Sequence, residues 1–278
     1  MKNILLPTDF SDNSWNAIKY ALQLFKDHKC HFTLLHTYTP ILYQFEYLQS
    51  STPQFQVLET VKETAKKKLA SVLKKIETEF YNPNHLFAQT ASFNTLSEEI
   101  NQLYKGKVMD MIIMGTKGAS GFKEVLFGSN TVHVLKNAKC PLLAIPTNFA
   151  FEAPHEILFP SDYEIDFQEK HIQILVDMAT TYHARVNILN VTHDSDLSEK
   201  QERNRRKLEL YFDKVAKQFH SVRTLNVPEA ITKFQLKKRI NLLVMINNKH
   251  SFFENVFFKS NIKQIGFHLN VPFLVIPS

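Results

Sequence analysis

The chain has 278 residues, of which 44% are hydrophobic and 22% are charged. This balance excludes an intrinsically disordered chain, and the length suggests two domains of ordinary size. No stretch approaches the roughly 20 consecutive apolar residues of a membrane-spanning helix. The N-terminal sequence MKNILLPTDF lacks the long apolar region of a signal peptide. We therefore expect a cytoplasmic protein with no membrane partner.

The charge pattern and the cysteine content bear on two questions: whether the chain binds nucleic acid, and whether it contains a disulfide. The formal net charge is +6, and the densest basic groups lie at 66–68, 203–207 and 237–239. Each group lies in a segment with helical periodicity and acidic neighbours, which favours a solvated helix face over a nucleic-acid site. The only cysteines are Cys30 and Cys140. Both lie beside apolar stretches, which favours two reduced, buried thiols over a disulfide.

The sequence consists of two similar repeats. Residues 2–11, KNILLPTDFS, match residues 155–164, HEILFPSDYE, and residues 140–147, CPLLAIPT, match residues 271–278, VPFLVIPS. The first pair is 153 residues apart and the second pair 131, so the second repeat is shorter by 22 residues. We expect one domain at 1–147 and another at 154–278, joined by a segment short enough for them to pack together.

Apolar runs and helical periodicity alternate along both repeats. In the first repeat we expect a strand at 4–6, a helix at 12–28, a strand at 31–37, a helix at 55–80, a strand at 85–90, a helix at 97–105 capped by Thr95 or Ser97, a strand at 109–114, a helix at 131–137 and a strand at 142–145. In the second we expect a strand at 157–159, a helix ending at 182, a strand at 185–191, a helix at 198–219, a strand near 221–225, a helix at 229–239, and strands at 242–246 and 273–276. This alternation predicts an α/β fold of two doubly wound, five-stranded parallel-sheet domains.

Most of the glycines are concentrated in one short segment. Four of the six in the chain fall within fourteen residues, between an apolar strand and a helix: Gly115, Gly118, Gly121 and Gly128. Glycine lets a ligand approach the backbone closely, and the N-terminus of the following helix offers unpaired amides that favour an anion. The spacing is neither GxxxxGK[ST] nor GxGxxG. From these residues alone, a phosphate site and a tight strand-to-helix connection both remain open.

The spacing of these glycines resembles the nucleotide signature of ATP-binding universal stress proteins. Gly115-Thr-Lys-Gly118 is followed, after nine residues, by Gly128-Ser129, which is that family's pattern of Gly, two residues, Gly, nine residues, Gly and a hydroxyl residue. The segments PTDFS (7–11) and LLH (34–36), which close the first two strands, are also typical of the family. The resemblance covers both repeats, although the second matches mainly by its pattern of strands and helices.

The resemblance implies Rossmann-like domains that bind ATP, with or without Mg²⁺, where the winding of the sheet reverses. By similarity, the base and ribose lie against Pro7, Thr8 and Asp9, and Thr37 abuts the adenine. The remaining positions follow the ribose and phosphates: Met114, Gly115, Thr116, Gly118, Gly128, Ser129, Asn130 and Thr131. It also implies that the last strands of the two domains pair as an intramolecular pseudo-dimer, while further homo-oligomerisation stays open.

The second repeat departs from the nucleotide pattern. Lys259 aligns with Gly128, and one deleted residue places Asn247 opposite Gly115 and His250 opposite Gly118. Asp162 is retained opposite Asp9. We therefore expect one nucleotide per chain, held in the first domain.

The function expected is that of a nucleotide-binding stress-response or regulatory protein, with an adenine nucleotide as ligand and an unknown protein partner. No arginine lies near the glycine-rich segment, and no metal-binding carboxylate pair is evident, whereas rapid phosphoryl transfer needs both kinds of group. A slow ATPase or phosphotransfer enzyme and a ligand-free interaction module are the alternatives.

Overall fold

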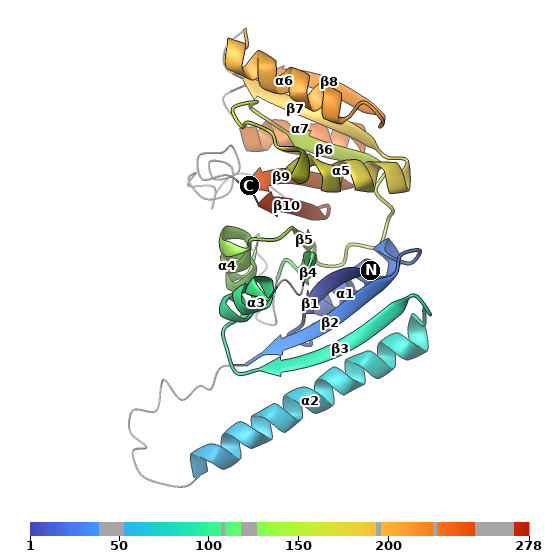
Figure 1. Cartoon of the computed structure of the whole chain (residues 1–278), viewed down its shortest axis with the longest axis vertical. Coiled ribbons are helices and arrows are strands. Elements are labelled where there is room, and N and C mark those ends of the chain that lie inside the picture. The colour runs from blue at the N-terminus through green and yellow to red at the C-terminus, as the bar shows by residue number, and fades with distance from the viewer. Residues whose placement is uncertain are drawn as a thin grey trace. The chain divides into compact units, whose positions relative to one another are not determined.

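The computed structural model describes residues 1–38, 53–106, 109–117, 127–192, 196–224, 227–247 and 270–277 (Figure 1). These residues form two compact units, and the boundary between them falls between Leu142 and Leu143, inside the strand that completes the first repeat. Because the division falls inside a strand, the domain limits of 1–147 and 154–278 stay predictions, as does the pairing of the last strand of one domain with that of the other.

The first unit alternates strands and helices in the predicted order. Its elements are β1 (Lys2–Pro7), α1 (Asp12–Leu24), β2 (Cys30–Thr37), α2 (Pro53–Glu79), β3 (His85–Ser92), α3 (Leu96–Lys105), β4 (Met111–Gly115), α4 (Ser129–Asn137) and β5 (Leu142–Ile145). The strand order is β3-β2-β1-β4-β5, and β1 is parallel to both β2 and β4. Winding therefore reverses between β1 and β4, which is where open α/β sheets bind their ligands.

The second unit repeats this architecture with elements of similar length. They are β6 (Glu156–Pro160), α5 (Glu169–Tyr182), β7 (Arg185–Thr192), α6 (Glu199–Tyr211), β8 (Lys217–Arg223), α7 (Val227–Lys238), β9 (Leu242–Asn247) and β10 (Phe273–Pro277). The strand order is β8-β7-β6-β9-β10, which is the order of the first unit, and the pairs are parallel. The predicted α/β fold, with parallel strands in the same order in both units, is thereby confirmed.

Apolar strands buried on both faces make up the core of each unit. Leu5, Leu34 and Ile112 in the first unit are fully buried, as expected of a parallel sheet with helices on both faces. In that unit α1 packs against β1 and β4, α2 packs against β2 and β3, and α3 packs beside α4. These contacts leave the carboxyl ends of β1 and β4 between helix termini.

Helix caps set where two of these helices begin. The Ser14 amide donates to the Ser11 side chain at 3.3 Å, and the Glu98 amide donates to the Thr95 hydroxyl, also at 3.3 Å. Such side chains satisfy amides that have no partner within the helix. Of the two caps predicted for α3, Thr95 is the one used.

The predicted boundary between the helix at 198–219 and the strand at 221–225 was wrong. The helix α6 ends at Tyr211, and β8 already begins at Lys217. Phe212 is completely buried, and its ring centroid lies 6.3 Å from that of Phe159 in β6. Burial of this ring directs the chain back to the sheet, where Phe219 pairs with Ile188. The apolar residues at 212–219 thus serve a turn and a strand rather than a helix face.

A smaller boundary difference concerns α1, which ends at Leu24 rather than at 28. The amide of the cap residue Phe25 donates to the Ala21 carbonyl, and the His28 amide donates to the Phe25 carbonyl at 2.9 Å, which forms a turn. On α2, the apolar residue Val61 lies in line with the buried Ala65 and Leu69 at helical spacing, but it is 39% exposed. This part of α2 lies near the start of the helix, and the buried face is well covered only from Ala65 onward.

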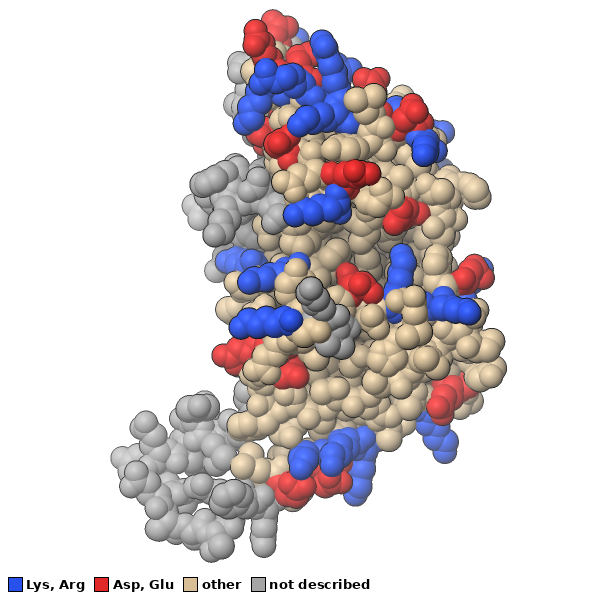
Figure 2. All heavy atoms as spheres, viewed as in Figure 1, with Lys and Arg blue, Asp and Glu red and all other residues tan. Residues whose placement is uncertain are grey.

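Cysteines and basic groups are placed as the sequence indicates. Cys30 and Cys140 are free and buried, and burial raises the pKa of their thiols to about 11 and about 12. The basic side chains on the visible face are interspersed with acidic ones (Figure 2). Lys66 pairs with Glu63 at 2.8 Å, for example. Mixed charge of this kind is typical of a solvated surface.

Candidate functional site

A cavity of about 310 Å³ lies in the first unit, at the carboxyl ends of β1, β2 and β4. Its volume is near the lower end of small-molecule sites, which span about 300–1,000 Å³. Ten of the twelve predicted site residues line it: Pro7, Thr8, Asp9, Thr37, Met114, Gly115, Gly128, Ser129, Asn130 and Thr131. The structure therefore brings together three segments that are far apart in the sequence.

The other two predicted site residues are Thr116 and Gly118. Thr116 is buried, and its carbonyl accepts a hydrogen bond from the Gly128 amide at 2.8 Å. Its place is therefore behind the wall, where it holds the start of α4. Gly118 lies outside the described residues, as do Gly121 and Lys123.

The turn after β1 positions Asp9 at the rim of the cavity. The Thr8 amide donates to the Leu35 carbonyl at 2.8 Å, and the Phe10 amide donates to the Thr8 hydroxyl oxygen at 3.0 Å. Phe10 has a φ of 66°, a left-handed conformation uncommon for a residue with a side chain. The buried Thr8 thus shapes the turn. The exposed Asp9 carboxylate accepts from the Ser11 hydroxyl at 2.6 Å and from the Ser11 amide at 3.1 Å.

Sequence reasoning missed five residues of the lining: Ser14, Leu35, His36, Leu96 and Lys117. The Nδ1 of His36 lies 2.8 Å from the Thr8 carbonyl. Because a carbonyl oxygen only accepts, Nδ1 carries the proton. The motif LLH indicated the end of β2, but only the next residue, Thr37, was assigned to the site. Leu96 comes from the start of α3, and no local pattern predicts that contact.

The far end of the cavity is formed by the first turn of α4. Its N-cap is Gly128, which has no side chain that could cap the helix. The amides of a first turn have no acceptor within the helix, and the helix dipole there favours negative charge. Ser129 and Asn130 are exposed beside these amides, and Lys117 adds a positive side chain to the lining. This end of the cavity suits a phosphate group.

In the second unit, the turn after β6 is held by hydrogen bonds equivalent to those of the turn after β1. The Ser161 amide donates to the Leu189 carbonyl at 2.9 Å, and the Tyr163 amide donates to the Ser161 hydroxyl at 3.0 Å. Tyr163 has a φ of 57°, matching that of Phe10. Asn190 replaces His36 and donates to the Ser161 carbonyl at 3.0 Å. The structural match of Asp162 to Asp9 follows from these bonds.

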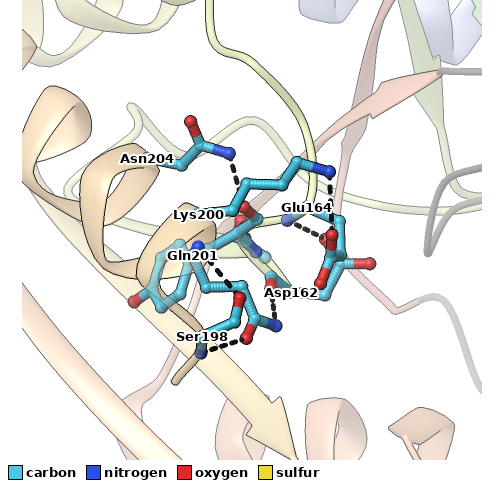
Figure 3. Close-up of polar contacts among 8 residues, drawn as sticks. Asp162, Glu164, Ser198, Lys200, Gln201 and Asn204 are labelled. Carbon is cyan, nitrogen blue, oxygen red and sulfur yellow. Dashed lines mark hydrogen bonds and ion pairs between the residues drawn. The ribbon is translucent and has the colours of Figure 1, made fainter.

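The helix α6 covers this turn in the second unit (Figure 3). The Gln201 side chain donates to the Asp162 carbonyl at 3.0 Å, and that of Asn204 donates to the Tyr163 carbonyl at 2.7 Å. Lys200 pairs with Glu164 at 3.0 Å. Burial raises the pKa of Asp162, although the Glu164 amide donates to its carboxylate. Two backbone carbonyls of this turn are thus hydrogen-bonded to side chains of α6.

The register of the strands corrects one alignment between the repeats. Leu5 pairs with Ile112 as Leu158 pairs with Leu243, so the residue that corresponds to Gly115 is Ile246 rather than Asn247. Ile246 is buried, with 4% of its surface exposed. No deletion is needed within the strand, and a branched side chain occupies the place of Gly115. His250 and Lys259 lie outside the described residues.

The described residues hold no group of three or more His, Cys, Asp or Glu residues that could bind a metal ion. None of their helices is long and apolar enough to cross a membrane.

Comparison with known proteins gives a consistent result. The family model described as "Universal stress protein family" matches residues 1–146. Universal stress protein MJ0531 of Methanocaldococcus jannaschii is 30% identical over 151 residues, which cover 52% of this chain and 81% of that protein. Universal stress protein MJ0577 of the same organism is 29% identical over 157 residues, covering 52% of this chain and 94% of that protein. A crystal structure of a universal stress protein from Archaeoglobus fulgidus covers 99% of this chain and 98% of its own, with a TM-score of 0.73 at 19% identity, and supports the fold alone.

Proposed function

Because this chain belongs to the universal stress protein family, we propose that its first unit binds ATP as part of a stress-response or regulatory role. The observation that carries the proposal is the cavity between β1 and β4. It joins a carboxylate at one rim to an uncapped helix N-terminus at the other. A nucleotide presents hydroxyl donors at its ribose and negative charge at its phosphates, in the same relative order.

Each part of the nucleotide has a complementary group in the cavity. The Asp9 carboxylate accepts hydrogen bonds from the ribose hydroxyls, because carboxylates are strong acceptors. The phosphates lie at the first turn of α4, near Ser129, Asn130 and Lys117, and the adenine lies beside Thr37. A Mg²⁺ ion that arrived with ATP would be held mainly by phosphate oxygens and water.

Binding, rather than rapid turnover, is the activity that this lining supports. Lys117 is the one Lys or Arg among the described lining residues. Fast phosphoryl transfer relies on bound metal and on further charges that stabilise the transferring group. A slow ATPase activity is therefore a secondary candidate, and it is separated from binding by measuring phosphate release alongside affinity.

The second unit serves in this proposal as a partner domain without nucleotide. Its turn at 161–164 is covered by α6, and Ile246 stands where the first unit has Gly115. The bonds from α6 occupy the turn that corresponds to the Asp9 rim of the first unit, and the branched side chain of Ile246 leaves no place for a counterpart of Asn13. The chain is thus a nucleotide-binding domain fused to a modified copy of itself.

Equilibrium titration tests the proposal most simply. Wild-type protein should bind ATP saturably, and Asp9→Ala should weaken binding about tenfold or more, because hydrogen bonds to charged groups contribute about 1.5–3 kcal/mol. Asp162→Ala, at the matching position of the second unit, is the control and should leave affinity unchanged. Absence of saturable binding in the folded wild-type protein would refute the proposal, and so would equal losses in the two variants.

A further inference from the structure

Asn13, in the first turn of α1, contacts the glycine-rich segment from behind the cavity. Its side-chain amide donates to the Lys117 carbonyl at 2.7 Å, across 104 residues of sequence. Asn13 is buried and is not among the lining residues, whereas Gly115 and Lys117 are. It therefore acts on the cavity only through the segment that it holds.

The orientation of the Asn13 amide group is fixed by its partner. Turning the group over would place its oxygen against the Lys117 carbonyl oxygen, and two acceptors repel each other at that distance. In the orientation observed, the buried Oδ1 has no hydrogen-bond partner among the described residues. An unpaired buried oxygen costs free energy. An asparagine at this position is therefore poorly explained by stability alone.

Gly115 is required by Asn13. A Cβ atom at Gly115 would lie 2.4 Å from Nδ2 and 2.8 Å from Cγ of Asn13, with the Asn13 backbone oxygen at 3.1 Å. The first two distances are shorter than any van der Waals contact between such atoms. At this position the glycine admits the asparagine side chain, whereas the sequence suggested that it admits the ligand.

The second unit lacks both members of this pair. The position of Gly115 is taken by Ile246, and the first turn of α5, which begins Glu169-Lys170-His171, holds no asparagine. The helix there also starts later, at Glu169. The same fold therefore forms without the contact, and the unit that lacks the contact is the one whose turn is covered.

We propose that Asn13 is a positioning residue, which sets the Gly115–Lys117 segment in the place where it receives the nucleotide phosphates. The inference rests on the proposed function, since it assigns a role within that site. Loss of the Asn13 side chain should move the segment and weaken nucleotide binding, while the fold is kept.

Four variants test this: Asn13→Ala, Gly115→Ala, the double variant, and Asp166→Ala as a control at an exposed side chain of the second unit. Asn13→Ala should weaken ATP binding about five- to tenfold, the equivalent of one lost hydrogen bond. Its urea midpoint should change little, because the unpaired oxygen is removed together with the bond. Gly115→Ala should lower both stability and affinity, and its effect on stability should be smaller when Asn13 is already alanine. Asp166→Ala should leave affinity unchanged.

Two outcomes would overturn the inference. One is an Asn13→Ala variant with wild-type affinity, whatever its stability, since a purely structural residue behaves in that way. The other is found by amide hydrogen exchange, which can be measured without ligand. If Asn13 positions the segment, exchange of residues 115–117 should be faster in Asn13→Ala than in the wild-type protein. Unchanged exchange would reject the positioning role even if the wild-type protein binds no ATP, so the two proposals fail separately.

Discussion

The Thr131 hydroxyl donates a hydrogen bond to the Gly115 carbonyl at 3.1 Å, joining the first turn of α4 to the last residue of β4. A hydroxyl has one proton to donate, so Thr131 cannot also donate to a phosphate while this bond persists. Its hydroxyl therefore sets the distance between the two walls of the cavity. In the proposed binding mode, contact with the phosphates is therefore made by the backbone amides rather than by this hydroxyl.

Replacement of Thr131 by valine keeps its shape and removes this bond. Because the Gly115 carbonyl then loses a buried partner, we expect a destabilisation of about 1–3 kcal/mol in urea unfolding. ATP affinity should fall several-fold. Thr64→Val is the control, since Thr64 donates to the Thr60 carbonyl on the exposed surface of α2. An effect no larger than that of the control would show that the Thr131 bond does not hold the cavity.

Gly128→Val should abolish ATP binding without unfolding the protein. The backbone of Gly128 has φ −64° and ψ 158°, which a residue with a side chain adopts without strain. The added side chain would, however, stand at the mouth of the first-turn amides of α4. Titration and thermal unfolding should be measured on the same preparation. The same loss is expected for a bulky residue at Gly118, and retention of full affinity in Gly128→Val would contradict the assignment of the phosphate end.

Most of the fold could be predicted because its signals are local, and ten of the lining residues could be assigned because short local motifs resemble those of the family. A strand followed by PTD, or by a glycine and a helix, specifies its own carboxyl end. The rest depends on contacts between distant segments. Asn13 pairs with Lys117 across the unit, and the burial of Phe212 against Phe159 ends α6 early. Neither Asn13 nor Phe212 belongs to a local motif. Their roles could therefore not be predicted before the structure showed which segments lie side by side.

Asp162→Asn should stabilise the protein at neutral pH. Burial raises the pKa of Asp162 in the folded state, so the folded protein holds this proton more tightly than the unfolded chain does. Stability from this residue is thus greatest below the unfolded pKa, about 3.9, and is lost as pH rises through the folded value. Asparagine keeps the acceptor for the Glu164 amide and carries no charge. The difference between variant and wild type in urea unfolding should shrink toward acid pH, and a difference that grows there would contradict the sign.

The stoichiometry of ATP binding tests the central claim most directly, because it asks at once whether the chain binds nucleotide and which unit does so. Calorimetric titration of the full chain should give a value near one, unchanged in Asp162→Asn and with affinity reduced in Asp9→Ala. A stoichiometry near two, or saturable binding that survives in Asp9→Ala but is lost in Asp162→Asn, would contradict the assignment of a single site to the first unit.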